Sequence, residues 1–465
     1  MLREHRRFFL WTALAGLVLR LFFFVYFPSV TDDSRIYLDL ASNWLQHGVY
    51  GQTQLGLVVA TDTRLPGYPA FLAAVFMIFG PGNVRAIFLA QILVDLVTCL
   101  LVADLARRAI PGRSAGREAF LLAALCPFLA NYSAAVLTET LEVFFTALAL
   151  DLSLAALDRM RDGTSAARLW TAAGAAISAC ILLRPDGGIL LAALLLSLLS
   201  CLAFRTRPSV PRPSVPAIVW SALLVMAVAI APLVPWTIRN SRALHHFQPL
   251  APRYATESDE LAPRGFNRWV RTWIADYASV EEVYWNVPGD KIDPDKLPAR
   301  ALDPPTRDAT LALIADYNQS ADLTPALDAR FEALAAQRIR AHPVRYYGTL
   351  PLLRVADVWL RPRTELLPPD VRWWEFDDDA WASAVAVVLG ILSLVYVAAA
   401  CIAFVARRRE IRHFALLGGF LLLRSLFLAT VENPEPRYTL ECYPVIMVAA
   451  AALLARRTTQ HSVLS

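Results

Sequence analysis

The sequence predicts an all-α, polytopic membrane protein with about ten transmembrane helices, interfacial helices and a small extracytoplasmic domain. First, 57% of the 465 residues are hydrophobic and the mean hydropathy is +0.45, which is more apolar surface than one soluble domain could bury. Second, apolar segments of roughly 16–25 residues recur along the chain. Third, arginine clusters occupy alternate loops, as is typical of multi-pass membrane proteins.

Ten segments are long and apolar enough to cross a hydrocarbon core of about 30 Å, some at the short end of the range. They lie at 8–28, 84–106, 118–135, 138–157, 168–183, 187–204, 215–236, 381–405, 412–430 and 440–455. The first has the basic start of a secretory signal. It ends at Phe22–Pro28 without the small residues of a cleavage site, so we interpret it as a retained anchor.

Arginine sets the orientation of these spans, because basic residues in short loops stay in the cytoplasm. The basic loops contain Arg3, Arg6 and Arg7, then Arg107, Arg108, Arg113 and Arg117, Arg159, Arg161 and Arg168, Arg205, Arg207 and Arg212, Arg407, Arg408, Arg409 and Arg412, and Arg456 and Arg457. Both termini are therefore predicted to be cytoplasmic. This topology requires that 68–79, roughly twelve residues against the usual twenty, is an interfacial or re-entrant helix and not a span.

The composition excludes several other functional classes. All six cysteines fall in or at the edge of apolar spans without paired spacing, which indicates neither a disulfide framework nor a zinc site. The seven histidines show no HExxH pattern. The net charge of +4 largely reflects arginines that anchor cytoplasmic loops, so no nucleic-acid partner is expected.

The topology divides the chain into three parts: an N-terminal membrane module at 1–236 with its first extracytoplasmic loop at 29–83, an extracytoplasmic domain at 237–380, and C-terminal transmembrane helices at 381–465. In the extracytoplasmic domain, Thr324 as N-cap and Pro325 begin a helix that stops before His342. The segment 350–359 is predicted to be a helix lying on the membrane. The domain's tryptophans either stack on sugar rings or form its core; they are Trp269, Trp273 and Trp285.

The first loop contains an amphipathic helix that begins at two adjacent acids. Its apolar stripe consists of Tyr37, Leu40, Ala41, Trp44 and Leu45, and Gly48 follows as a C-cap. The helix begins at Asp32-Asp33-Ser34, where acids can serve as caps. One acid would be enough for capping, so two acids and a serine beside the membrane favour a functional site that accepts a proton or holds a cation.

Three further turns on the same predicted face contain charged residues. Arg64 precedes a rigid Leu-Pro-Gly-Tyr-Pro turn and can bind a phosphate in a bidentate way or contact ordinary lipid headgroups. Glu139 and Glu142 open a span after Thr138, and capping would explain only one of them. Arg184 in Arg-Pro-Asp-Gly-Gly faces a helix N-terminus and can bind an anion, or it pairs with Asp186 at the surface.

A fourth turn, Glu432–Tyr438, combines two glutamates with Arg437 and Tyr438 before the last span. The charged residues inside spans are expected to pair with each other for structural reasons; they are Arg20, Asp95, Asp151 and Arg424. The turn residues instead collect on one face, which chance would not produce. Acids beside phosphate-binding cations at a lipid boundary suit a substrate with a lipid tail, a phosphate and a reactive group, such as a polyprenyl-phosphate sugar.

Taken in order, these residues resemble the integral-membrane GT-C glycosyltransferases, in particular their ArnT-like and protein O-mannosyltransferase-like bacterial branch. The resemblance rests on Asp32-Asp33 with Tyr37 and Trp44–Gly48, on Arg64–Pro69, on Leu137-Thr-Glu-Thr-Leu141, and on Leu183-Arg184-Pro185, Pro235-Trp236, His342-Pro343 and Arg437-Tyr438 before Pro444. It implies a GT-C fold and a first-loop acid that activates the acceptor. The family's usual acidic pair is Asp-Glu. By order Asp33 takes the place of the glutamate, although its shorter side chain could shift the role to Asp32.

The resemblance implies inverting transfer of a sugar from a polyprenyl-phosphate donor to an acceptor (lipid A or lipopolysaccharide, polysaccharide or protein) at a bacterial inner membrane. The implied roles are base for Asp32 or Asp33, donor phosphate binding for Arg64, Arg184 and Arg437, and substrate binding for Tyr68, Glu139 and Tyr438. Divalent metal use varies in such enzymes, and Asp32 and Asp33 would hold a Mg²⁺ or Mn²⁺ ion if one takes part. The alternatives are a lipid-linked-sugar flippase or other transporter and an O-antigen ligase or polymerase.

Overall fold

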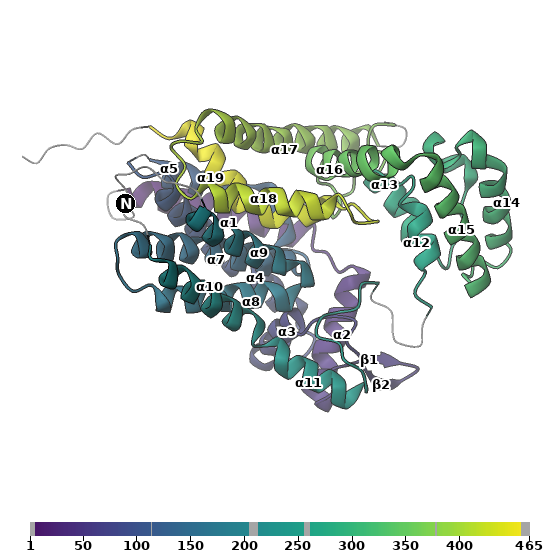
Figure 1. The fold of residues 1–465 in the computed structure, drawn as a ribbon, viewed down its shortest axis with the longest axis horizontal. Helices are drawn as coiled ribbons and strands as arrows, with labels where there is room; N and C mark the ends of the chain where they lie inside the picture. Colours follow the sequence, from purple (N-terminus) through teal and green to yellow (C-terminus); the bar gives the residue numbers. More distant parts are fainter. Residues whose placement is uncertain (1–4, 113, 204–212, 255–260, 377–378, 457–465) are drawn as a thin grey trace, which may run out of the picture. The chain divides into compact units, whose positions relative to one another are not determined.

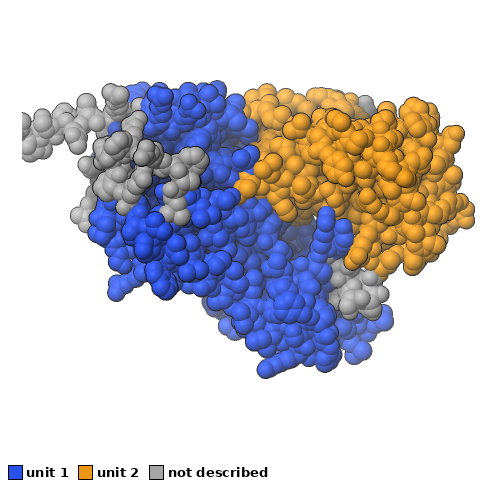
Figure 2. All heavy atoms as spheres, in the orientation of Figure 1, with its two compact units in different colours: residues 1–257, 396–422, 440–465 blue, residues 258–395, 423–439 orange. Residues whose placement is uncertain are grey.

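The structure, a computed structural model, describes residues 5–112, 114–203, 213–254, 261–376 and 379–456. Several of the arginines used above to orient the chain lie outside these residues, namely Arg3, Arg113, Arg205, Arg207, Arg212 and Arg457. The described chain forms two compact units (Figure 2). Unit 1 comprises 1–257, 396–422 and 440–465, and unit 2 comprises 258–395 and 423–439.

Unit 1 is a bundle of helices with one β-hairpin (Figure 1). Its elements are α1 (Arg6–Tyr26), α2 (Asp32–His47), β1 (Gly51–Gln54), β2 (Leu57–Ala60), α3 (Gly67–Phe79), α4 (Val84–Ala109), α5 (Ala115–Ala124), α6 (Pro127–Tyr132), α7 (Glu139–Arg161), α8 (Ala167–Leu183), η1 (Pro185–Gly187), α9 (Gly188–Ala203), α10 (Val215–Ile230), α11 (Leu233–Ala243) and α19 (Tyr443–Leu454). Helix α7 packs between α4 and α8, and α19 packs on α4 and α5. The hairpin was not predicted.

Unit 2 is a smaller helical domain with two longer apolar helices. It contains α12 (Arg264–Val270), α13 (Tyr277–Ser279), the π-helices η2 (Val280–Tyr284) and η6 (Arg345–Thr349), α14 (Arg307–Tyr317), α15 (Pro325–Ala341), α16 (Leu350–Leu360) and the short 3-10 turns η3 (Pro294–Lys296), η4 (Ala299–Ala301) and η5 (Pro304–Thr306). Helices α17 (Ala380–Ala406) and α18 (Phe414–Leu428) and the 3-10 segment η7 (Pro436–Cys442) contribute residues to both units.

The apolar helices confirm the polytopic membrane class but not the number of spans. Among the described residues, six helices are long and apolar enough to cross a membrane: 6–26, 84–109, 139–161, 215–243, 380–406 and 436–454. Shorter apolar helices correspond to the predicted spans at 168–183, 187–204 and 412–430. The predicted span 118–135 is divided into α5 and α6, because Pro127 at the start of α6 cannot continue the preceding helix. A count of ten spans is therefore not confirmed.

Helix α3 is short, as the predicted topology requires. Its 13 residues extend about 20 Å at the α-helical rise, less than a hydrocarbon core of about 30 Å. The predicted α15 is confirmed, since Thr324 is its N-cap and accepts a hydrogen bond from the Leu327 backbone N–H. Helix α16 also forms where an interfacial helix was expected, while its position on a membrane remains a prediction.

The tryptophans of unit 2 separate into core and surface residues. Trp269 and Trp273 are fully buried and pack with Phe266 and Phe331 in the hydrophobic core between α12 and α15. They are therefore core residues and not sugar-stacking residues. Trp285 differs, because 44% of its surface is exposed.

Charged groups inside the apolar helices of unit 1 are satisfied by specific partners. Arg20 of α1 donates to Asp95 of α4 at 2.7 Å, and both side chains are buried. The same guanidinium donates to the Gly16 and Ala124 carbonyls. Asp151 of α7 pairs with Arg108 of α4 at 2.7 Å. In unit 2, Arg424 donates to the Tyr438 carbonyl. The structural interpretation holds for these residues, although Asp151 and Arg424 have partners other than those expected.

Breaking the Arg20–Asp95 pair should strongly destabilise unit 1. We expect Asp95→Ala to lower the free energy of unfolding by about 3–5 kcal/mol, because the buried guanidinium would lose its counter-charge. The exposed Arg330–Asp316 pair has the same 2.7 Å separation, so Asp316→Ala is the matched control and should change the value by no more than about 1 kcal/mol. Unfolding of detergent-solubilised protein measures both. Equal effects would contradict the role given to the buried pair.

Candidate functional site

The N-terminus of α2 is capped without using its two acids. Thr31 is the N-cap: its hydroxyl accepts from the Ser34 backbone N–H, and the Ser34 hydroxyl accepts from the Thr31 backbone N–H. This reciprocal arrangement satisfies the helix end. At the other end, Gly48 adopts φ 67°, the predicted left-handed C-cap. Capping therefore does not account for Asp32 and Asp33, which follow the cap in the first turn.

The structure gives the two acids different surroundings. Asp33 accepts a hydrogen bond from the Arg64 guanidinium at 2.9 Å, and both side chains are partly buried. Asp32 is 95% exposed and pairs only loosely with Arg35, at 3.2 Å on the helix surface. Of the two acids, Asp33 is the one that is partly buried and that contacts another predicted site residue, Arg64.

The backbone that carries Arg64 is held by the β-hairpin and α11. The Tyr50 hydroxyl donates to the Arg64 and Leu65 carbonyls at 2.9 and 3.1 Å. Arg239 of α11 donates to the Tyr50 and Thr61 carbonyls at the two ends of the hairpin, and it lies over the rings of Tyr50 and Trp236. These contacts fix the position from which the Arg64 side chain reaches α2.

Tyr37 lies at the centre of the predicted charged residues of unit 1. Its ring is buried, meets the Tyr68 ring edge-on at a centroid distance of 5.0 Å, and lies 5.9 Å below the Arg64 guanidinium. Burial raises the pKa of Tyr37 to about 12, and the charges of Arg64, Asp33, Arg184 and Glu139 act on its phenol. The phenol therefore stays protonated at neutral pH, surrounded by charged groups from four separate segments of the chain.

Arg184 is held by three carboxylates. It is the C-cap residue that follows α8, in extended conformation, and its guanidinium lies 3.8 Å from Glu139, 3.5 Å from Glu142 and 3.3 Å from Asp186. Thr138 makes no side-chain cap hydrogen bond, so helix capping does not explain the two glutamates. With Asp33 and Arg64, the site has four carboxylates and two guanidinium groups. Carboxylates therefore outnumber guanidinium groups in this site, and such a site stabilises positive charge that develops on a reacting atom better than it binds a simple anion.

A buried hydrogen-bond network orients the elements around these charges. The Tyr68 hydroxyl of α3 donates to Gln91 of α4 at 2.7 Å, and the Gln91 amide donates to the Ala135 carbonyl at 2.7 Å. Ser29, just before α2, bonds through its backbone to Ala134 and Val136. Tyr68 is itself fully buried. Its contacts are those of a scaffold residue, and the substrate contact predicted for Tyr68 stays a prediction.

The predicted residues of unit 2 form a separate group. Arg437 donates to Glu435 at 2.5 Å and lies over the Tyr438 ring, and the Tyr438 hydroxyl also donates to Glu435. Asn433 donates to both Glu435 and Tyr438. Within unit 1, the structure brings together Asp33, Arg64, Glu139 and Arg184.

The structure also contains paired residues that sequence reasoning missed. His246, after α11, lies 2.7 Å from the buried Asp62 carboxylate, two residues before Arg64. No sequence pattern connects residues so far apart, and the hairpin that brings them together was not predicted. Among the described residues no cluster of three His, Cys, Asp or Glu side chains could hold a metal ion, and we assign no step below to a metal.

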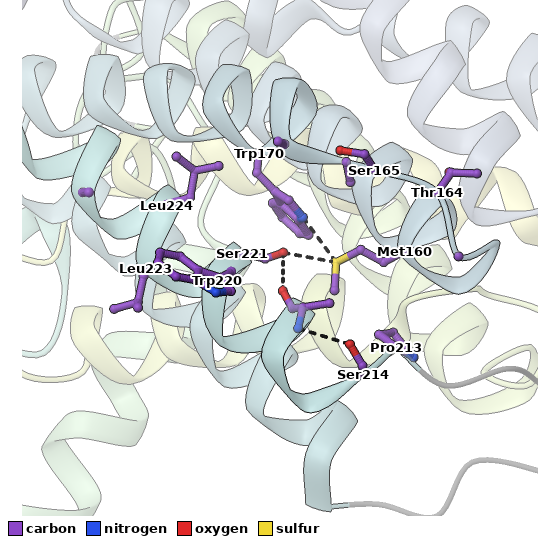
Figure 3. Close-up of a pocket in the computed structure, with 15 residues that line it drawn as sticks. Met160, Thr164, Ser165, Trp170, Pro213, Ser214, Trp220, Ser221, Leu223 and Leu224 are labelled. Atoms are coloured by element: carbon purple, nitrogen blue, oxygen red, sulfur yellow. Dashed lines mark hydrogen bonds between the residues drawn. The ribbon is translucent and has the colours of Figure 1, made fainter.

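A pocket of about 850 Å³ lies apart from these charges (Figure 3). It is lined by residues of α8, α10 and the connection before α8, including Trp170, Trp220 and Leu224. Trp170 and Ser221 both point toward the Met160 sulfur, at 3.2 and 3.5 Å. No titratable side chain is among the 15 lining residues. This pocket suits an apolar chain and not proton transfer.

Comparison with known proteins supports one fold. A sequence model of the family described as dolichyl-phosphate-mannose-protein mannosyltransferase matches residues 63–236, a segment that includes Arg64, Glu139 and Arg184. The oligosaccharyltransferase of Archaeoglobus fulgidus with a tethered acceptor peptide has a TM-score of 0.52 and 15% identity, covering 97% of this chain and 49% of that one. The oligosaccharyltransferase AglB from the same organism, in complex with an inhibitory peptide and a dolichol-phosphate, has a TM-score of 0.50 and 15% identity, covering 97% and 50%.

ArnT from Cupriavidus metallidurans bound to undecaprenyl phosphate is less similar, with a TM-score of 0.41 and 15% identity over 96% of this chain and 77% of that one. No curated protein matches the sequence. The chain spans about half the length of the oligosaccharyltransferases it matches. The resemblance to membrane glycosyltransferases and the GT-C fold predicted from the sequence are confirmed.

The close approach of α3 to the end of α8 should be essential for the site. A Cβ on Gly67 would lie 2.6 Å from the Leu182 carbonyl oxygen, so Gly67→Ala must push α3 away from the residue pair that precedes Arg184. We expect it to lower stability by about 1–3 kcal/mol. The unfolding temperature of the detergent-solubilised protein measures the effect.

Gly188→Ala is the matched control in the turn after Arg184. A Cβ on Gly188 would meet nothing within 4 Å, and its φ of −61° is helical. This variant should unfold at the wild-type temperature or slightly above it. If both variants unfold alike, close packing at Gly67 does not position the site.

Proposed function

We propose that this chain is a glycosyltransferase that moves a sugar from a polyprenyl-phosphate donor to an acceptor at the non-cytoplasmic face of a membrane, with inversion at the anomeric carbon. The GT-C fold, the mannosyltransferase family match over 63–236 and the apolar helices support this function. The dolichol-phosphate bound to the oligosaccharyltransferase from Archaeoglobus fulgidus supports a lipid-linked donor.

The observation that carries the proposal is the Asp33–Arg64 pair. It places a carboxylate and a guanidinium 2.9 Å apart at the N-terminus of α2, with both side chains partly exposed. Glycosyl transfer from a phosphate needs a base for the acceptor and a cation for the leaving group within one site. The pair supplies one of each.

In the proposed mechanism Asp33 accepts the proton of the acceptor hydroxyl. The acceptor oxygen forms a bond to the anomeric carbon while the bond between that carbon and the phosphate oxygen breaks, so the polyprenyl phosphate leaves on the opposite face. Positive charge develops on the sugar ring in a transition state that resembles an oxocarbenium ion. The acid-rich surroundings of Arg184 favour such charge, because carboxylates stabilise a developing cation.

Arg64 is the main phosphate-binding residue in this proposal. Its planar guanidinium matches two phosphate oxygens, and negative charge on the departing phosphate strengthens that contact in the transition state. Arg184 and Arg437 keep their proposed role in phosphate binding, but each is already paired with carboxylates. Glu139 and Tyr438 are proposed substrate contacts, and Tyr68 acts by positioning α3 against α4.

The proposed setting is a bacterial inner membrane, with both chain termini cytoplasmic and the 29–83 loop on the opposite face. The arginine pattern of the short loops supports this orientation. The partners are the polyprenyl-phosphate sugar and a lipid, glycan or protein acceptor. A flippase or other transporter would move the intact donor without consuming it. An O-antigen ligase or polymerase would consume a diphosphate-linked donor. Whether a donor is consumed, and which donor, therefore distinguishes these alternatives from the proposed function.

Asp33→Asn should abolish most of the turnover, while Asp32→Asn should leave it nearly unchanged. Loss of a general base typically lowers the rate by about 10²–10⁴-fold, whereas the Asp32 side chain is 95% exposed and forms a surface ion pair with Arg35. The assay uses protein in nanodiscs, a panel of polyprenyl-phosphate sugars and detection of released carrier phosphate. Full turnover by the Asp32→Asn, Asp33→Asn double variant would refute the catalytic role of the acids.

Substitutions at Arg64 should weaken binding of the leaving polyprenyl phosphate more than binding of the acceptor. We expect Arg64→Gln to lower turnover by about 10²-fold or more and to weaken product inhibition by polyprenyl phosphate, because one charge-stabilising donor is lost. Arg64→Lys should lie between the variant and the wild type, since it keeps the charge but not the planar fork. Inhibition constants for carrier phosphate measure this. If polyprenyl phosphate inhibits Arg64→Gln as strongly as the wild type, Arg64 does not bind the carrier phosphate.

A further inference from the structure

Unit 2 carries an aromatic surface that the proposed reaction does not use. Tyr277 meets Trp285 edge-on at a centroid distance of 5.5 Å. The Arg361 guanidinium lies 5.5 Å from the Tyr277 ring and also 5.5 Å from the Trp374 ring. We call Tyr277, Trp285, Arg361 and Trp374 the aromatic platform. Trp285 and Trp374 are 44% and 46% exposed, so its two indoles are accessible while Tyr277 and Arg361 are buried beneath.

The platform is rigid because its buried members are bonded on several sides. Asp357 of α16 accepts from the Tyr277 backbone N–H at 2.9 Å and lies 3.8 Å from Arg361. Arg361 also donates to the Val371 carbonyl, on the chain that leads to Trp374. Rigid aromatic rings lose little conformational freedom when they bind, which is why exposed indoles on a fixed base indicate a recognition surface.

Acidic groups surround the platform. Burial raises the pKa of the Tyr277 phenol, and the charges of Glu365, Glu435 and Glu281 raise it further. Burial also raises the pKa of the Glu365 carboxyl, against the charges of Arg363, Arg361 and Arg437. The Oε1 atom of Glu365 is buried and has no hydrogen-bond partner among the residues that the structure describes. Such an acceptor is costly unless a hydroxyl or amine approaches it.

We propose that the aromatic platform binds a pyranose ring of the substrate. The faces of a pyranose present C–H groups that pack on indole rings, and its hydroxyls are donors for carboxylates such as Glu281 and Glu365. The carboxyls of Glu281 and Glu365 lie near the guanidinium groups of Arg361, Arg363 and Arg437. This mixture of charges suits a neutral sugar ring with several hydroxyls. This inference rests on the proposed glycosyl transfer for the identity of its substrate, while binding itself needs no turnover.

Saccharide binding to the full chain in nanodiscs tests the platform. The probes are methyl glycopyranosides, a short-chain polyprenyl-phosphate sugar and polyprenyl phosphate alone, with affinities measured by calorimetry. We expect Trp285→Ala and Trp374→Ala each to weaken glycoside binding by about tenfold, or roughly 1.4 kcal/mol, and to leave carrier phosphate binding unchanged. Glu365→Gln should weaken glycoside binding similarly while it preserves the shape of the side chain.

Trp11→Ala is the matched control, because Trp11 is an exposed tryptophan of unit 1 at 67% and this variant should leave all affinities unchanged. Wild-type glycoside affinity in both Trp285→Ala and Trp374→Ala would overturn the proposal. It would also be overturned if these variants lost nanodisc insertion without any change in glycoside affinity, since the indoles would then be membrane anchors.

The arms separate this inference from the proposed function. If the wild-type protein binds glycosides but transfers no sugar, the proposed reaction is refuted and the platform is supported. Intact transfer with both the acceptor KM and the donor KM unchanged in the Trp285→Ala, Trp374→Ala double variant would refute the platform and support the reaction. If the platform recognises the acceptor glycan, the double variant raises the acceptor KM; if it recognises the donor sugar, it raises the donor KM. Either rise supports the platform.

Discussion

The Asp33–Arg64 ion pair is the interaction on which the organisation of the site depends. It joins the first turn of α2 to the segment before α3, which are 31 positions apart in the chain. The pair forms because Thr31 and Ser34 cap α2 by themselves, and because Tyr50 and Arg239 hold the backbone of Arg64. A partly buried carboxylate needs such a partner, since an unpaired charge away from water is poorly solvated.

Arg184 shows how the ends of two packed helices create the second part of the site. Its guanidinium leaves the end of α8 and meets Glu139 and Glu142 in the first turn of α7. The two helices pack against each other, so these charges face each other at one end of the bundle. Buried Tyr37 then lies within the field of both ion-paired groups. The result is a cluster of charged and polar side chains at the end of α8 and the start of α7.

The buried Arg20–Asp95 pair has structural partners, and the contrast with Asp33 and Arg64 supports the site assignment. Arg20 and Asp95 are both buried, and the same guanidinium also binds two backbone carbonyls. Asp33 and Arg64 are partly exposed, which leaves room for a ligand to approach. The difference between the two pairs is accessibility and not chemistry, since each consists of one carboxylate and one guanidinium.

Local composition and periodicity determined the membrane class, helix α2 with its Gly48 cap, and helix α15 with its Thr324 cap, because these features depend on residues a few positions apart. The sequence also indicated the residues Asp33, Arg64, Glu139 and Arg184, since each lies in a turn on one predicted face of the membrane. Only the tertiary structure distinguished Asp33 from Asp32, surrounded Arg184 with carboxylates and buried Trp269 and Trp273. Ion pairs and burial depend on which distant segments pack together, and no local pattern in one sequence encodes that packing.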